Sequence, residues 1–171
     1  TGRGFAPRSL LFALARSEGR ATTFNAKLLS VEEEAVGELL SVDGNLVSRS
    51  DAGAHHTFFC DAGFGMHFLG HWVRDLGVFD LASAIVKLTS EPAKVYGLTG
   101  RGSLVPGNAA DFILIDPDQI GISKTHRLKD LPAGGERLVR SAPGLIGTWV
   151  NGVQIFDGEN YCDVSGPGAV I

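Results

Sequence analysis

The sequence predicts an α/β fold followed by a small antiparallel β module. In the first part of the chain, helical and β-like segments alternate over residues 7–17, 21–25, 30–40 and 45–48, with short connections between them. This alternation is typical of parallel βα units, in which reactive groups lie where the strands end. From Gly100 onward, short β-like runs separated by turns replace the alternation. Two domains are therefore expected, residues 1–99 and residues 100–171.

Each early segment has its own local signal. Residues 7–17 carry leucines at helical spacing, and residues 21–25 are a short run rich in β-formers. Ser30 and Glu33 form a capping box that opens a helix to about residue 40. An Asp-Gly turn then leads into the strand expected at residues 45–48.

Three helices are expected in the middle of the chain, over residues 64–76, 80–88 and 92–96. The first two carry apolar residues on one face, and Asp80 is placed to cap the second helix. Glycines follow the first and third helices, where a left-handed residue commonly ends a helix.

The C-terminal part is expected to be antiparallel. Residues 111–116 read as a strand, and residues 146–150 and 153–156 read as a hairpin joined by Asn151-Gly152, which supplies the positive φ angles of a two-residue turn. Residues 118–144 are expected to form a long irregular surface loop.

Composition narrows the class of protein. Hydrophobic residues make up 44% and charged residues 20% of the 171 residues, which is typical of a folded globular chain. The net charge of −4 argues against a nucleic-acid partner, and no apolar run is long enough to span a bilayer. We therefore expect a cytoplasmic protein without a membrane partner. Cys60 and Cys162 are expected to be free thiols, and the absence of an initiator Met suggests a chain that begins inside a larger protein.

The stretch that gathers the most side chains capable of catalysis follows residues 45–48 and reads Arg-Ser-Asp-Ala-Gly-Ala-His-His. Asp51, His55 and His56 are presented where the expected strand ends. A carboxylate beside two imidazoles can accept a proton, bind a metal, or simply form a hydrogen-bonded turn, and these residues alone leave all three open.

Several motifs occur together in one order along the chain: Ser50-Asp51-Ala52-Gly53-Ala54-His55; His71-Trp72-x-Arg74-Asp75; Thr89-Ser90-x-Pro92-Ala93-x-x-Tyr96-Gly97-Leu98; Arg101-Gly102-x-Leu104-x-Pro106-Gly107-x-x-Ala110-Asp111; Asp130-Leu131-Pro132-Ala133-Gly134-Gly135; and Trp149-Val150-Asn151-Gly152. Together they resemble the C-terminal portion of the amidohydrolase superfamily, in its N-acyl-D-amino-acid deacylase (D-aminoacylase) branch. The resemblance covers residues 22–158.

The resemblance implies part of a larger fold. That family has a (β/α)8 barrel and a small β-sandwich, and a whole barrel takes ~250 residues. By resemblance, residues 22–25 and 45–48 are the last two barrel strands, so the chain is expected to hold a partial TIM barrel of two βα units. The strands after residue 100 would be the C-terminal strands of the sandwich.

The resemblance also implies a chemistry. Asp51 matches the carboxylate that takes a proton from a zinc-activated water and passes it to the leaving amine, and it can also contact the metal. The other zinc ligands of the family lie upstream of this chain. His55 matches a residue at the mouth of the site that contacts substrate.

Other candidate residues favour a structural interpretation. His67 and His71 are four residues apart on one predicted helix, but the Glu of a helical zinc motif is missing, so packing or hydrogen bonding is expected. No base is placed beside Cys60 to make it a nucleophile.

The leading hypothesis is a zinc-dependent amidohydrolase acting on the amide of N-acyl-D-amino acids or related small amides. Two alternatives stay open. One is a non-catalytic, self-associating module that forms a homo-oligomer. The other is an amidohydrolase with a different substrate, either a cyclic amide, as for dihydropyrimidinases and hydantoinases, or an isoaspartyl peptide.

Overall fold

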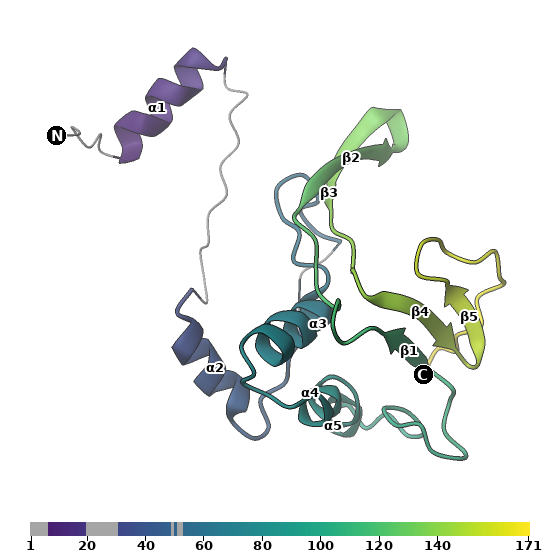
Figure 1. The fold of residues 1–171 in the computed structure, drawn as a ribbon. Coiled ribbons are helices and arrows are strands. Elements are labelled where there is room, and N and C mark those ends of the chain that lie inside the picture. Colours follow the sequence, from purple (N-terminus) through teal and green to yellow (C-terminus); the bar gives the residue numbers. More distant parts are fainter. Residues whose placement is uncertain (1–6, 20–30, 49, 51–52) are drawn as a thin grey trace. The chain divides into compact units, whose positions relative to one another are not determined.

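The structure, a computed structural model, describes residues 7–19, 31–48, 50 and 53–171 (Figure 1). The chain divides into two compact units, residues 1–36 and residues 37–171. In the first unit, α1 (Pro7–Ser17) confirms the predicted helix. The strand predicted at residues 21–25 and the capping residue Ser30 lie outside the described residues. α2 (Glu33–Ser41) confirms the second predicted helix.

The helices of the middle of the chain supply the core of the second unit. α3 (Phe64–His67) continues into η1 (Phe68–Asp75), a π-helical segment, and α4 (Leu81–Leu88) and α5 (Ser90–Val95) follow. All three predicted helices are confirmed, with a π-helical stretch in the first and an earlier start in the third. The most buried apolar side chains among the described residues are Phe68, Leu69, Trp72, Ala84, Ala93 and Ile120.

One close approach joins these helices to the C-terminal half. A Cβ on Gly70 of η1 would lie 2.5 Å from the carbonyl oxygen of Ile120, so only glycine lets the two backbones come this near. Arg74, one turn further along η1, donates a hydrogen bond of 2.6 Å from Nη1 to the same carbonyl oxygen. Backbone contact and guanidinium together fix the segment around Ile120 against η1.

A three-stranded antiparallel sheet has the order β1 (Phe112–Ile115), β4 (Leu145–Val150) and β5 (Val153–Phe156). The predicted strand and hairpin are confirmed, and the turn residues Asn151 and Gly152 have φ angles of 47° and 80°. The Phe112 and Trp149 rings stack across β1 and β4, with their centroids 4.8 Å apart. Cross-strand aromatic pairs of this kind stabilise a sheet.

Residues 118–144 were expected to be irregular, and that prediction was wrong. They contain a second antiparallel ribbon, β2 (His126–Leu131) paired with β3 (Gly135–Val139). Every residue of β2 is exposed, so the alternation of apolar and polar residues that marks a half-buried strand is absent. Cross-strand charge pairs stabilise the ribbon instead, including Arg137 with Asp130, whose two hydrogen bonds are 2.8 and 2.6 Å long.

The strand expected at residues 45–48 is also corrected, because these residues belong to no helix or strand. A strand needs a neighbour to pair its backbone groups, and none of the described strands pairs with this segment. The two barrel units implied by the resemblance are therefore not confirmed. The domain boundary expected at residue 99 stays a prediction.

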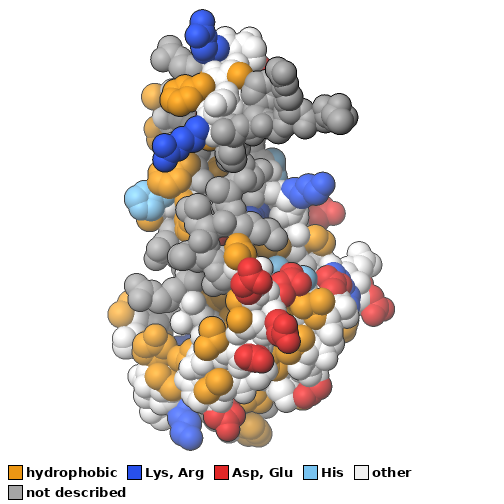
Figure 2. Space-filling view, turned by 90° about the vertical axis from the view of Figure 1, so that its left-hand side faces the viewer, with side chains coloured by type: hydrophobic (Ala, Val, Ile, Leu, Met, Phe, Trp, Pro, Cys, Tyr) orange, Lys and Arg blue, Asp and Glu red, His pale blue; other side chains and the backbone are white. Residues whose placement is uncertain are grey.

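Many large apolar side chains of the described residues are exposed. Leu114 of β1 is 50% exposed and Phe112 is 36% exposed. One face of the molecule shows apolar side chains interspersed with acidic ones (Figure 2). Among the described residues, no helix has both the length and the apolar character that a membrane crossing needs.

Candidate functional site

The main candidate, Asp51, lies outside the described residues, which include residues 31–48 and 50 before it and residues 53–171 after it. Residues 53–59, named here the 53–59 loop, begin two positions after it. Residues 53–58 are exposed, and Phe58 exposes 70% of its surface. This loop and residues 45–48 are therefore the described parts of the chain on either side of Asp51 in sequence.

The 53–59 loop turns at His55, whose backbone is left-handed with a φ angle of 55°. The amides of Phe58 and Phe59 both donate to the carbonyl of His55 at 3.0 Å, which closes a tight turn. The imidazole of His55 lies against the Phe58 ring, with 5.1 Å between centroids. Left-handed backbone at a residue other than glycine costs energy and is often found at functional sites.

The β2–β3 ribbon binds this loop through two hydrogen bonds. The amide of Leu138 donates to the carbonyl of His56 at 2.8 Å, and Nη1 of Arg127 donates to the carbonyl of Thr57 at 3.1 Å. The loop that precedes α3 accordingly runs beside the ribbon in Figure 1. A ribbon that the sequence did not predict thus holds the residues that follow Asp51.

The segment before Asp51 is held from α4. Lys87 is buried, with a relative exposure of 8%, and its Nζ lies 3.4 Å from the carbonyl oxygen of Asn45 and 3.9 Å from the Glu91 carboxylate. Asn45 also donates from Nδ2 to the carbonyl of Leu39 at 2.7 Å. Donors from distant parts of the chain therefore bind the carbonyl of Asn45, before Asp51 in sequence, and the carbonyls of His56 and Thr57, after it.

The histidines of η1 and the end of α3 form a local stack. The rings of His67 and His71 are 5.0 Å apart and nearly parallel, at 11°, and His71 meets the edge of Trp72. Further along the helix, the hydrogen bond from Arg74 lowers the pKa of the Asp75 carboxyl, with smaller contributions from the charges of His71 and His67. The arrangement is that of a packed helix surface beside an ion pair.

A metal was expected from the resemblance, so the fit of the side chains to zinc matters. In the part of the chain that the structure describes, no three His, Cys, Asp or Glu side chains come close enough together to hold a metal ion. A catalytic zinc normally needs three protein ligands. The described residues alone therefore do not fit a zinc site. Cys60 and Cys162 are half-buried free thiols.

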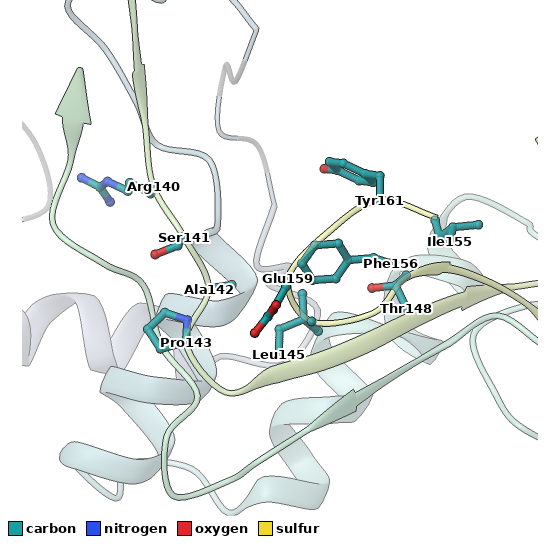
Figure 3. Close-up of a pocket in the computed structure, with 11 residues that line it drawn as sticks. Arg140, Ser141, Ala142, Pro143, Leu145, Thr148, Ile155, Phe156, Glu159 and Tyr161 are labelled. Atoms are coloured by element: carbon teal, nitrogen blue, oxygen red, sulfur yellow. The ribbon is translucent and has the colours of Figure 1, made fainter. Parts of the chain in front are cut away.

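A pocket of about 680 Å³ lies elsewhere, between the end of β3 and the C-terminal sheet. Figure 3 shows Phe156 and Tyr161 on one side of it and Ser141, Ala142 and Pro143 on the other. His55 and the other residues of the 53–59 loop do not line it. Its size does not make it the candidate active site, because its described lining residues include none of the groups to which the sequence motifs assign chemistry.

Two residues at the candidate site were not identified from the sequence. Arg127 fell in the stretch expected to be irregular, although Gly134-Gly135 between charged runs is a hairpin signal. Lys87 interrupts the apolar stripe of α4, and a buried lysine usually has a partner. Its partner, the carbonyl of Asn45, is 42 residues away in sequence.

Comparison with known proteins identifies the family. A family model described as an amidohydrolase family matches residues 9–156. The chain therefore belongs to this amidohydrolase family, as the sequence motifs predicted.

Individual relatives match shorter parts of the chain. A D-aminoacylase from Alcaligenes xylosoxydans xylosoxydans is 33% identical over 93 residues, which are 54% of this chain and 17% of that protein. An N-acyl-D-aspartate deacylase from the same organism is 36% identical over 87 residues, 51% of this chain and 16% of that protein. A solved D-aminoacylase structure matches 58% of this chain and 19% of its own, with 30% identity and a TM-score of 0.46. The chain spans about a sixth of the length of these curated relatives.

Proposed function

We propose that the intact protein containing this chain hydrolyses the amide bond of N-acyl-D-amino acids. The observation that carries this proposal is the family match over residues 9–156, which spans the Asp51 motif, together with deacylase relatives that are 33% and 36% identical. The exposed, anchored loop that follows Asp51 supports it, because binding and catalytic residues are often placed on loops that a rigid scaffold positions.

In the proposed reaction, Asp51 acts first as a general base. Its carboxylate takes a proton from the attacking water, while the water oxygen forms a bond to the acyl carbon. The protonated Asp51 then gives this proton to the amide nitrogen as the carbon–nitrogen bond breaks. The products are a carboxylic acid and a free D-amino acid, and Asp51 returns to its charged form.

His55 is proposed to contact the substrate from the 53–59 loop. Its imidazole is exposed and rests on Phe58, so a donor or acceptor nitrogen can reach a bound carboxylate or acyl group. Zinc is implied by the resemblance, but the described residues do not by themselves fit it.

The test compares two aspartates in the intact protein. Turnover of N-acetyl-D-amino acids is measured against the L-enantiomers, for the unaltered protein, for Asp51→Asn and for Asp61→Asn. Asp61 is a nearby exposed carboxylate with no assigned role, which makes it a matched control. We expect Asp51→Asn to lower kcat by about 10² to 10⁴-fold, the usual contribution of a general base, and Asp61→Asn to have little effect. Full turnover in Asp51→Asn contradicts the assigned mechanism.

A further inference from the structure

The ribbon contact with the 53–59 loop involves one side chain, that of Arg127. Its Nη1 donates to the carbonyl of Thr57 at 3.1 Å, across 70 residues of sequence. The only other hydrogen bond described between the ribbon and this loop is between backbone groups, from Leu138 to His56. Arg127 is therefore the side chain whose replacement tests this attachment.

The hydrogen bond from Arg127 falls within the turn that follows Asp51 in sequence. Thr57 is six residues after Asp51 and lies inside the turn that His55 closes. A left-handed residue persists only where its surroundings hold it in place. The two ribbon bonds fall on the carbonyls of the two residues that follow His55, so they hold the backbone just beyond the left-handed residue.

The ribbon also orients the guanidinium. Arg127 Nη1 lies 3.9 Å from the Glu136 carboxylate on β3, and Lys129 pairs with the same carboxylate at 3.1 Å. Lys129 thus shares the acidic partner of Arg127, but no described contact joins it to the loop. Both residues place a cation on β2, but of the two only Arg127 is described as bonding to Thr57.

We propose that Arg127 is a positioning residue for the hydrolytic reaction. It acts through the carbonyl of Thr57, holding the 53–59 loop that follows the proposed base in sequence. This role rests on the proposed function of Asp51. A small displacement of a catalytic group can cost much of the rate, so the effect is expected in kcat more than in KM.

The first experiment needs no substrate and reads the loop directly. Amide hydrogen exchange is followed in the intact protein, in Arg127→Gln and in Lys129→Gln. We expect the peptide covering residues 53–60 to exchange at least several-fold faster in Arg127→Gln only, with α3 and η1 unchanged in all three proteins. Equal exchange of that peptide in the two variants overturns the inference.

The second experiment measures turnover of an N-acetyl-D-amino acid. We expect kcat to fall about 10-fold in Arg127→Gln with KM nearly unchanged, since the misplaced group is the base and not the binding surface. Arg127→Lys should recover part of the loss, because an ammonium can also donate to the Thr57 carbonyl. Lys129→Gln should match the unaltered protein.

The outcomes separate the two proposals. If Asp51→Asn inactivates the intact protein but Arg127→Gln and Lys129→Gln have the same kcat, the positioning role is overturned. The proposed function is then unaffected. Turnover that survives Asp51→Asn refutes the base assignment and with it the catalytic role of Arg127. The exchange experiment still decides whether Arg127 holds the loop.

Discussion

Gly70 and Ile120 approach so closely that a Cβ on Gly70 would be 2.5 Å from the Ile120 carbonyl oxygen and 2.9 Å from the Cα of Gly121. Both atoms belong to the backbone, so neither can rotate away as a side chain can. The same carbonyl receives the hydrogen bond from Arg74. The contact joins the helical part of the second unit to the segment that leads into the β2–β3 ribbon.

Replacing Gly70 with alanine should therefore destabilise the protein. Alanine favours a helix over glycine by up to ~1 kcal/mol, but overpacking against fixed backbone costs ~1–3 kcal/mol, and we expect a net loss of about 1–2 kcal/mol in the free energy of unfolding. Urea unfolding of the intact protein measures it. Gly65→Ala is the control, because its Cβ would meet only Leu88 methyl groups at 3.9 Å. Equal stability of the two variants would contradict the close approach.

The hairpin turn gives a second stability prediction. Gly152 has a φ angle of 80°, while its added Cβ would have room, 3.8 Å from the Cβ of Ala110. Gly152→Ala should therefore cost only the strain of left-handed backbone, ~1–2 kcal/mol. Gly166→Ala, with no left-handed φ and no atom within 4 Å, should be near neutral in the same urea titration. A neutral Gly152→Ala would show that the turn relaxes at no cost.

The N-cap of α4 predicts a dependence of stability on pH. Hydrogen bonds from Ser83, first from its hydroxyl and then from its amide, lower the pKa of Asp80 below its ordinary value of 3.8. A lowered carboxyl pKa contributes stability that is present above the ordinary value and is lost as the pH falls through the folded-state pKa. The contribution of Asp80 should thus be complete near neutral pH and disappear under acid conditions.

Asp80→Asn tests this contribution, because an asparagine oxygen can still accept from the Ser83 amide but does not titrate in this range. We expect the unfolding midpoint of the unaltered protein to fall more steeply on acidification than that of Asp80→Asn. Asp80→Ala should lose the cap at every pH, so its deficit relative to the unaltered protein should shrink in acid. Parallel pH curves for the unaltered protein and Asp80→Asn would show that the titration of Asp80 does not contribute to the dependence of stability on pH.

The sequence predicted elements whose signals are local. Asp80 marked the start of α4, and Asn151-Gly152 marked the hairpin, because capping and turn chemistry need only a few neighbouring residues. The β2–β3 ribbon escaped detection because cross-strand charge pairs stabilise it. Asp130 and Arg137 are seven residues apart in sequence and carry no apolar alternation that would reveal the pairing.

The candidate site was predictable only as a motif. The order of residues around Asp51 indicated the family, and the family model confirmed it. The supports of the site were not predictable, because Lys87 reaches Asn45 across 42 residues and Arg127 reaches Thr57 across 70. Contacts at such separations depend on the packing of whole elements, and no short pattern records them.

His55 can contribute to the site through its backbone conformation and through its imidazole, and two substitutions separate these contributions. Asparagine adopts left-handed backbone more readily than most residues, whereas a β-branched residue does not. His55→Asn should therefore keep the turn and remove only the imidazole, and His55→Val should strain the turn as well. In the intact protein we expect His55→Asn to raise KM for N-acetyl-D-amino acids several-fold with kcat nearly unchanged. His55→Val should also lower kcat, because it disturbs the loop that follows Asp51.

His56→Asn is the matched control, since His56 contacts the ribbon through its backbone carbonyl and not through its imidazole. Its KM and kcat should equal those of the unaltered protein. Hydrogen exchange of residues 53–60 should be unchanged in both asparagine variants and faster in His55→Val, which checks that the backbone explanation is the right one. If His55→Asn and His56→Asn had the same KM, the imidazole of His55 would have no part in substrate binding, and its left-handed backbone would be the only feature of His55 that matters to the site.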